Sequence, residues 1–174
     1  LSTSIWLINT GLSKLESKKD PLKITSFDFY KFSKNHHVYG LANEKGIKVK
    51  IEVPKRFLLR VDVEKFKQVF INLLSNAIKF TEKKGIITVI ARDELNFWEI
   101  TIKDTGSGIP AEQVPKLFDK FFQVENYMTR YQGGTGLGLA IVKKIIDLHG
   151  GEIKVESEIG KGSSFIISIP KKIK

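Results

Sequence analysis

The chain has 174 residues, which fits one domain or one domain with a short appendage, and 41% of them are hydrophobic and 28% charged, as is typical of a globular protein. It contains no cysteine, which excludes a disulfide framework, a thiolate zinc site and a cysteine nucleophile. The formal net charge of +10 allows a nucleic acid, an acidic protein or a phosphorylated ligand as partner. Most lysines are spread singly along the chain, which favours a solvated surface.

The first 20 residues are predicted to form a unit of their own. Apolar residues recur there at spacings of three and four, at Ile5, Ile8, Leu12 and Leu15. Such a stripe indicates a short helix that packs against another helix. The sequence ESKKD at 16–20 and the following Pro21 end this pattern, because proline stops a helix. We therefore place a domain boundary here, with one domain over residues 21–174.

The second domain is predicted to mix helices and strands. Strands are expected at 22–29, 46–53, 57–61, 86–92, 97–103, 152–157 and 163–170. Helices are expected at 30–43, at 63–81 with Asp62 as N-cap, from about Pro110 to the aromatic cluster at 117–122, and at 138–149. This mixture, with its hairpins, predicts an α+β fold with helices on one face of a mixed, mostly antiparallel sheet.

Three glycine clusters lie at 104–108 (DTGSG), 133–140 (GGTGLGLA) and 160–162 (GKG). Each cluster alone is ambiguous. Glycine lets the backbone come close to a bound phosphate, but it is equally common in ordinary turns. The second cluster opens a helix, whose first N–H groups are unpaired and whose dipole favours an anion. The segment Thr135, Gly136, Leu137 and Gly138 is therefore a candidate phosphate cradle.

Asp104 ends a hydrophobic strand and precedes two glycines. A carboxylate there would accept a hydrogen bond from the exocyclic amine of a bound base, if apolar walls surround it. An aspartate that starts a turn would look the same in the sequence, so both interpretations stay open at this point.

Asn72 and Asn76 are four residues apart on the predicted long helix, and Lys79 lies three residues further. Their side chains share one side of the helix. Amide oxygens beside a lysine suit a site for Mg²⁺ and phosphate, because Mg²⁺ prefers oxygen ligands. The alternative is that the two amides cap neighbouring loops.

Five motifs in this order resemble those of one known family. They are DVEKFKQVFINLLSNAIKFT (62–81), DTGSGIP (104–110), KLFDKFF (116–122), GGTGLGLAI (133–141) and GKGSSF (160–165). They look like the N, G1, F, G2 and G3 boxes of the catalytic ATP-binding domain of sensor histidine kinases. The resemblance covers about residue 22 to the end and implies a Bergerat-type two-layer α/β sandwich that takes ATP and Mg²⁺. The preceding helix resembles the end of the family's dimerisation hairpin.

Carried over by position, the resemblance implies that Asn76 ligates Mg²⁺, with Asn72 beside it, and that Lys79 meets the phosphates. Phe80 would lie against the adenine, and Asp104 would accept from its amine. The other residues implied to surround the nucleotide are Gly106, Gly108, Ile109, Phe122, Gly134, Thr135, Gly136, Leu137, Gly138 and Leu139.

The same resemblance implies a mobile lid over about 123–133, anchored by Phe118, Phe121 and Phe122 unless these are plain core residues. Ser163 or Ser164 would help to hold Asp104 or a water.

Two features depart from the family pattern. Gln123 stands where many relatives carry an arginine that touches the γ-phosphate, and Arg130 in the lid is the expected substitute. The family's phosphoacceptor histidine is followed by an acidic residue, which is true of none of His36, His37 and His149. His149 is expected instead to end a helix, where its charge would suit the dipole. The histidine substrate is thus expected elsewhere in the full protein.

The resemblance implies as partners the protein's own dimerisation domain, in a full-length homodimer, and the receiver domain of a response regulator. No nucleic acid is expected. Because no apolar run of about 18 residues occurs, a membrane would be reached only through segments outside these residues, and the domain is expected in the cytoplasm.

A related ATPase of the gyrase, mismatch-repair or chaperone kind would resemble its relatives in placing a glutamate where Asn72 stands, and an amide cannot act as general base. The string GSGIPA at 106–111 resembles a dinucleotide fingerprint, but its proline and the preceding hairpin argue against a βαβ unit. A degenerate scaffold that binds ATP without transferring phosphate remains open.

Overall fold

The computed structural model describes residues 21–35, 39–124 and 135–172. The strands are β1 (Ile24–Asp28), β2 (Lys48–Glu52), β3 (Leu58–Asp62), β4 (Ile86–Asp93), β5 (Phe97–Asp104), β6 (Glu152–Glu158) and β7 (Gly162–Pro170). The helices are α2 (Phe29–Ser33), α3 (Gly40–Glu44), α4 (Val63–Phe80), α5 (Gly138–Leu148) and the short 3₁₀ turn η2 (Val114–Lys116). The predicted boundary at residue 20 and the preceding helix lie outside the described residues and stay predictions.

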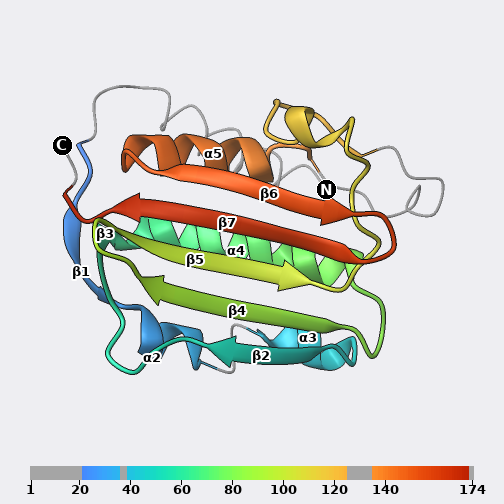
Figure 1. Cartoon of the computed structure of the whole chain (residues 1–174), viewed down its shortest axis with the longest axis horizontal. Helices are drawn as coiled ribbons and strands as arrows, with labels where there is room; N and C mark the ends of the chain where they lie inside the picture. The colour runs from blue at the N-terminus through green and yellow to red at the C-terminus, as the bar shows by residue number, and fades with distance from the viewer. Residues whose placement is uncertain (1–20, 36–38, 125–134, 173–174) are drawn as a thin grey trace.

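The main sheet has the strand order β2-β4-β5-β7-β6, in which β2 and β4 are parallel and the other neighbours antiparallel. The long helices α4 and α5 lie together behind this sheet in Figure 1, so the molecule has two layers. A separate antiparallel pair, β1 and β3, forms a small second sheet. The α+β prediction is therefore confirmed, but the second sheet was not predicted.

Helix α4 follows from the sequence. Asp62 caps its start by accepting a hydrogen bond of 3.2 Å from the backbone N–H of Lys65. The apolar positions at helical spacing are all buried, namely Phe66, Val69, Phe70, Leu73, Leu74, Ala77 and Ile78. Each of the larger side chains in this list contributes roughly 1.5–3 kcal/mol when it leaves water, and Ala77 contributes less. The helix ends at Phe80, so the polar residues of its last two turns are held on a regular helical backbone.

The strands of the hairpin β4–β5 alternate as the sequence indicates. In β5, Trp98, Ile100 and Ile102 are buried against the helices, whereas the residues between them lie on the open face of the sheet. The strand ends in Asp104, which is only 4% exposed although it carries a carboxyl group. The fold thus carries a carboxylate to the edge of the core, and a buried carboxylate requires partners.

The single helix predicted at 30–43 is wrong. Helix α2 ends at Ser33 and α3 begins at Gly40. The buried hydroxyl of Tyr39 donates a hydrogen bond of 2.9 Å to the carbonyl of Ser33, which a continuing helix would have used for its own N–H groups. The contact joins residues six apart, so helical periodicity does not reveal it.

The α-helix predicted from Pro110 is also wrong. Residues 111–122 form turns and the 3₁₀ turn η2, with a hydrogen bond of 2.9 Å from the N–H of Gln113 to the carbonyl of Pro110. Pro115 stands inside the predicted helix, where it cannot donate a hydrogen bond and its ring collides with the preceding turn. The segment is therefore a compact loop.

His149 ends α5 as expected, but the expected positive charge is wrong. The ring is fully buried, and its Nε2 accepts a hydrogen bond of 3.0 Å from the backbone N–H of Asp62. Because that N–H can only donate, the proton of the neutral ring is on Nδ1, 2.8 Å from the carbonyl of Ile145. Burial lowers the pKa of His149, which outweighs the opposite effects of the Ile145 carbonyl and the Asp62 charge. The histidine joins the end of α5 to the start of α4.

No helix in the part of the chain that the structure describes is long and apolar enough to span a membrane.

Candidate functional site

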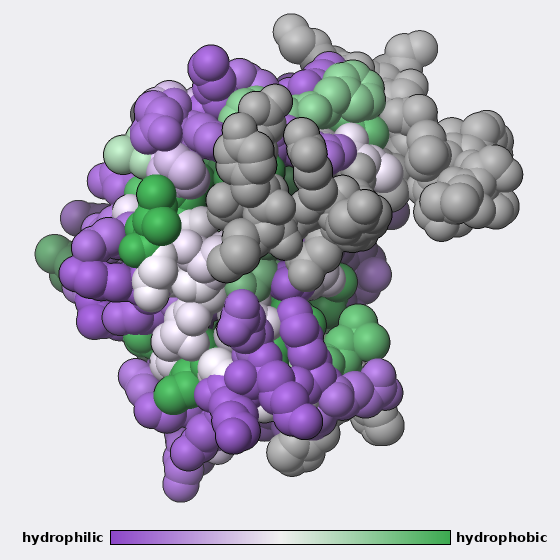
Figure 2. Space-filling view, turned by 90° about the vertical axis from the view of Figure 1, so that its right-hand side faces the viewer, coloured by the Kyte–Doolittle hydropathy of each residue, from purple (hydrophilic) through white to green (hydrophobic). Residues whose placement is uncertain are grey.

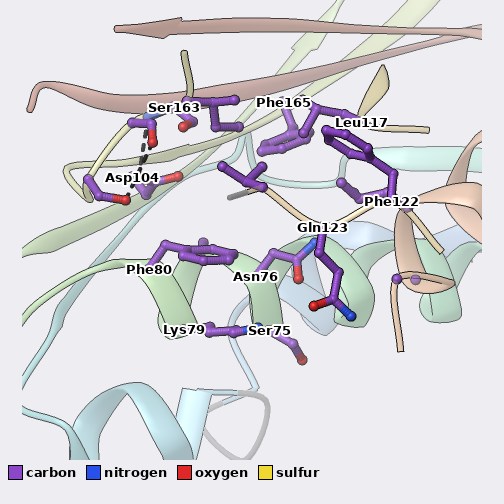
Figure 3. A pocket seen from close by; sticks show the side chains of 18 of the residues that line it. Ser75, Asn76, Lys79, Phe80, Asp104, Leu117, Phe122, Gln123, Ser163 and Phe165 are labelled. Carbon is purple, nitrogen blue, oxygen red and sulfur yellow. Dashed lines mark hydrogen bonds between the residues drawn. The ribbon is translucent and has the colours of Figure 1, made fainter. Parts of the chain in front are cut away.

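A cavity of about 340 Å³ lies where α4 ends, β5 ends and α5 begins. The ends of α4 and β5 lie toward the right in Figure 1. Figure 3 shows most of its side chains. Its walls are Ser75, Asn76, Ala77, Lys79 and Phe80 of α4, then Asp104, Ser107, Gly108, Ile109, Leu117, Phe122, Gln123 and Val124, then Thr135, Gly136, Gly138 and Leu139, and finally Ser163 and Phe165 of β7.

Asp104 lies at one end of the cavity with its carboxylate fixed (Figure 3). Its Oδ1 accepts hydrogen bonds from the backbone N–H groups of Gly106, at 2.8 Å, and Ser163, at 3.3 Å. No donor among the described residues is hydrogen-bonded to Oδ2. Burial raises the pKa of Asp104, and the two N–H donors act against this rise. The free oxygen can therefore accept a hydrogen bond from a ligand, while the bonded one is held in place.

Two glycines make this end of the cavity possible. A Cβ on Gly106 would lie 2.5 Å from the carbonyl oxygen of Phe80. Gly108 has φ = +72°, and a Cβ there would lie 2.1 Å from the carbonyl oxygen of Glu158. Any larger residue would push the loop after β5 away from α4 or from the β6–β7 turn. Gly106 supports the cavity from behind, whereas Gly108 lines it.

The walls between the two ends are apolar. The side chains of Phe80, Ile109, Leu117, Phe122, Leu139 and Phe165 surround the space. Figure 3 shows Phe80 on α4 facing the cavity from one side and Phe165 and Leu117 from the other. A slot of this kind, closed by one carboxylate, suits a flat heteroaromatic ring with an exocyclic amine.

The other end of the cavity is polar. Ser75, Asn76 and Lys79 project from the last two turns of α4. Lys79 places its ammonium 5.0 Å from the ring centre of Phe80, and partial burial lowers its pKa. Asn72 does not line the cavity, but its amide oxygen would be 3.7 Å from a Cβ on Gly138, so it lies beside the first turn of α5.

Helix α5 begins at this polar end. Thr135, Gly136, Gly138 and Leu139 line the cavity, and the first N–H groups of a helix are free to bind an anion. Leu137 does not line it, because its side chain is 1% exposed and belongs to the core. Its N–H donates to the hydroxyl of Thr135 at 3.4 Å.

The segments on either side of residues 125–134 are held together. The N–H of Phe121 donates to the carbonyl of Gly136 at 3.0 Å, and a Cβ on Gly136 would lie 2.7 Å from the Phe121 backbone. Phe121 itself is 68% exposed. The lid predicted over about 123–133 lies almost wholly outside the described residues, so its anchoring by Phe118, Phe121 and Phe122 stays a prediction.

The surroundings of the polar end are basic. The ammonium of Lys45 donates to the carbonyls of Ile78 and Lys79, at 2.8 and 3.0 Å, and so caps the end of α4. Lys83 packs on Gly46, and Lys84 follows it in an exposed turn. Figure 2 shows predominantly hydrophilic residues at this level, below the grey atoms. The positive electrostatic potential of these lysines favours an anionic ligand at the polar end.

The structure brings together most residues that the sequence analysis singled out. The predicted residues that line the cavity are Asn76, Lys79, Phe80, Asp104, Gly108, Ile109, Phe122, Thr135, Gly136, Gly138 and Leu139. Asn72, Gly106 and Leu137 lie behind its walls. Arg130 and Gly134 lie outside the described residues. Ser163 holds Asp104 as predicted, through its backbone N–H, whereas Ser164 pairs with Lys103 across the sheet.

Several wall residues were missed. Ser75 follows from helical spacing, since it is three residues after Asn72 and four before Lys79. Phe165 follows from the alternation of β7. Leu117 is part of the KLFDKFF motif, but the helix predicted around it does not form, so spacing did not show that it lines the cavity.

A family model for the histidine kinase-, DNA gyrase B- and HSP90-like ATPases matches residues 61–173. Among curated relatives, the sensor histidine kinase RcsC of Escherichia coli is 41% identical over 91% of this chain and 17% of its own length. The sensor histidine kinase WalK of Bacillus subtilis is 36% identical over 92% of this chain and 27% of its own length. The chain thus spans only about a quarter or less of the length of these relatives.

Solved structures agree with the sequence relatives. Full-length ShkA in complex with AMPPNP superposes with a TM-score of 0.82 at 25% identity, over 96% of this chain and 35% of that one. Histidine kinase ThkA in complex with the response regulator TrrA superposes with a TM-score of 0.73 at 31% identity, over 98% of this chain and 49% of that one.

Proposed function

Because the chain belongs to the family of histidine kinase-, DNA gyrase B- and HSP90-like ATPases, as the catalytic domain of a sensor histidine kinase, we propose that its cavity binds ATP with Mg²⁺ and that its substrate is a histidine on the dimerisation domain of the full-length protein. One observation carries this proposal. A single cavity has a fixed carboxylate with a free oxygen at one end, and the start of a helix beside a lysine and an amide at the other. The carboxylate end suits the adenine of ATP, and the polar end suits its phosphates.

Asp104 would select the base. Its free Oδ2 accepts a hydrogen bond from the adenine amine, whereas a base with a carbonyl at that position would place two acceptors against each other. The apolar walls exclude water from this contact, which strengthens it. Phe80 and Ile109 would lie against the faces of the ring.

The residues at the polar end fit a magnesium ion that is shared with phosphates. The described residues contain no group of three or more acidic or histidine side chains that could hold a metal alone. Asn76 offers one amide oxygen in the cavity, and Mg²⁺ usually takes few protein ligands and completes its shell with phosphate oxygens and water. We assign Asn76 as the protein ligand, with Asn72 beside it. When bound, the ion would neutralise charge on the phosphates.

The protein's part in phosphoryl transfer is positioning and charge stabilisation. The N–H groups at the start of α5 and the Lys79 ammonium would bind phosphate oxygens. No side chain in the cavity needs to act as a strong base, because a histidine acceptor is nucleophilic near neutral pH. Arg130 is proposed as a further contact to the γ-phosphate.

Proposed partners follow from the relatives. ThkA was solved with the response regulator TrrA, and we propose that a receiver domain likewise accepts the phosphoryl group in the pathway of the present protein. The dimerisation domain would precede the catalytic domain, with residues 1–20 as its end. We propose that the domain works in the cytoplasm and that any membrane anchor lies outside these residues.

Gln123 favours a second candidate function. This residue lines the cavity at the position where many relatives carry arginine. Without that charge, the cavity would bind ATP but transfer phosphate slowly or not at all. The protein would then be a scaffold that reports nucleotide binding.

Calorimetric titration of the chain with ATP and ADP, each with Mg²⁺, tests the proposal. Micromolar binding that Asp104→Asn abolishes is expected. Helices that bear the histidine are then supplied, and radiolabelled phosphate should appear on them. Binding without transfer would favour the scaffold. A folded sample that binds no nucleotide would overturn both functions.

A further inference from the structure

The hydroxyl of Ser157, on β6, lies where two segments meet that build the Asp104 end of the cavity. We call this the base end, because the nucleotide base is proposed to bind there. Its Oγ accepts a hydrogen bond of 2.8 Å from the backbone N–H of Ile109, in the loop after β5. The same Oγ is 3.0 Å from the carbonyl of Gly162 and 2.8 Å from the Oγ of Ser163, both on β7. One side chain thus joins the loop after β5 to the turn between β6 and β7.

The bonding capacity of this hydroxyl is fully used. A serine hydroxyl has one proton to donate and two lone pairs that accept. The proton goes to the Gly162 carbonyl, so one lone pair accepts from Ile109 and the other from Ser163, whose hydroxyl must be the donor. Ser157 has nothing left for a ligand, and it does not line the cavity. It can act on a nucleotide only through the residues that it holds.

Those residues determine where Asp104 stands. Ser163 donates its backbone N–H to Asp104 Oδ1, and a Cβ on Gly162 would lie 2.0 Å from the Asp104 carbonyl oxygen. Ile109, on the other side of Ser157, is itself a wall of the cavity. The hydroxyl therefore fixes the distance between the carboxylate and the wall that faces the base.

A second set of contacts also joins the loop after β5 to the turn between β6 and β7. The N–H of Gly160 donates to the carbonyl of Ser107 at 2.8 Å, and Gly108 packs on the carbonyl of Glu158. These contacts involve backbone alone, so they persist in a Ser157 variant and keep the turn near the loop. Loss of the hydroxyl would loosen this end of the cavity without opening it.

We infer that Ser157 is a positioning residue that sets the selectivity of the cavity for an adenine base over bases that carry a carbonyl at the same position. The inference deepens the proposed function and rests on it. A fixed Asp104 Oδ2 rejects a carbonyl oxygen, because neither acceptor can move away. A loosened loop lets the carboxylate and the base move apart. The repulsion between Asp104 and a carbonyl-bearing base then falls, and so does the stabilisation from the hydrogen bond to the adenine amine.

The competing explanation is that Ser157 only stabilises the hairpin. In that case Ser157→Ala would lower the free energy of unfolding, and any loss of folded protein would weaken the binding of every nucleotide by the same factor. The ratio of the dissociation constants for two nucleotides would not change. This ratio is therefore the quantity that separates the two roles.

The test is a calorimetric titration of ATP and GTP, each with Mg²⁺, into the wild type, Ser157→Ala and Ser157→Thr. Ser164→Ala is the matched control, because it removes a hydroxyl from the neighbouring strand on the opposite face of the sheet, where Ser164 pairs with Glu156 and Lys103. We expect Ser157→Ala to weaken ATP about tenfold and GTP by less than about twofold, so that the preference for ATP falls about fivefold or more. Ser157→Thr, which keeps the hydroxyl, should restore most of the preference, and Ser164→Ala should not change it.

If Ser157→Ala does not fold, Ser163→Ala takes its place, since it removes one hydrogen bond to Ser157 and leaves the N–H donor to Asp104. A reduced preference for ATP is again expected. An unchanged ratio in the folded variant overturns the inference, while ATP binding by the wild type and its loss in Asp104→Asn would still stand for the proposed function. If the wild type binds no ATP, the proposed function fails, and this inference with it.

Discussion

The two ends of the cavity differ in how many of their polar groups are already bonded. At the base end, Asp104 Oδ1 has two donors and Ser157 has three partners. At the polar end, the side chains of Asn76 and Lys79 have no hydrogen-bond partner among the described residues, and α5 begins beside the cavity with no side-chain cap. The base end is built to hold one geometry, whereas the polar end has bonding capacity left for phosphates and a cation.

This contrast predicts where a substitution costs stability and where it costs binding alone. A change at the base end that breaks existing contacts should affect both stability and binding, whereas one that keeps those contacts should affect binding alone. A change at the polar end removes a group that waits for the ligand, so it should leave the free energy of unfolding nearly unchanged.

The largest effect is expected for Gly108→Ala. The new Cβ would overlap the carbonyl of Glu158 and force φ = +72° on alanine, so the free energy of unfolding should fall by about 3 kcal/mol or more. Gly160→Ala is the matched control, because Gly160 has φ = +76° but open space around its Cβ position, and its cost should be near 1–2 kcal/mol. Urea denaturation measures both. Equal costs would mean that the close contact in the base end is not required.

Asp104→Asn should reduce ATP affinity about a hundredfold or more, or about 2.7 kcal/mol, since the amide can place a donor against the adenine amine. Stability should stay equal or rise. Burial raises the pKa of Asp104 in the folded state, so its ionisation opposes folding above that pKa, and an amide removes this opposition.

Asp93→Asn is the control for this substitution, because Asp93 lies exposed at the end of β4. Calorimetry and denaturation are run on both variants. Retained ATP binding in Asp104→Asn would contradict the role of the carboxylate, and a large loss of stability would contradict the sign of its pKa shift.

Asn76→Ala tests the polar end. We expect ATP affinity in the presence of Mg²⁺ to fall about tenfold, with little change in its absence, because only the contact with the cation is lost. The free energy of unfolding should change by less than about 0.5 kcal/mol, since Asn76 has no hydrogen bond among the described residues and alanine suits a helix. Gln68→Ala, an exposed amide on the same helix, controls for the substitution. An equal loss with and without Mg²⁺ would argue against Asn76 as ligand.

The smallest effect concerns His149, which lies away from the cavity. Its folded pKa is lowered by burial, so the unfolded chain binds a proton more readily, and stability should fall as the pH drops below the ordinary histidine pKa of about 6.5. The neighbouring Asp62 has a lowered pKa, because the N–H donors Lys23 and Lys65 and the Lys65 charge outweigh its burial, so it titrates below this window.

Denaturation at pH 7.5 and 5.5 should show a loss of up to about 1.4 kcal/mol for the wild type and a smaller one for His149→Gln. The preference for ATP over GTP should stay the same at both pH values. A preference that follows this titration would mean that the two regions are coupled.

The fold class and most residues of the cavity walls could be predicted from the sequence, because both depend on short-range patterns. Helix α4 and the hairpin β4–β5 follow from apolar spacing, and Asp104 and Asn76 were found through their places at the ends of such elements. The predictions were wrong where a proline inside a helical pattern, or a contact that helical periodicity does not reveal, decided the structure. Tyr39 ends α2 through the Ser33 carbonyl, and Pro115 interrupts the helix expected from Pro110. His149 is neutral because the N–H of Asp62, 87 residues away in the sequence, requires an acceptor.

The sequence by itself determined the long helices, most of the strands and the polar residues at their ends. Helical and strand spacing places apolar residues on one face, and glycines permit close approaches of the backbone. The tertiary structure decided how these ends meet. It bonded one oxygen of Asp104 and left the other free, it placed Asn72 behind the wall and Asn76 in it, and it used the hydroxyl of Ser157 to join two segments that are 48 residues apart. Hydrogen bonds have a fixed reach and a fixed number of partners, so their assignment depends on where the packed elements bring each group.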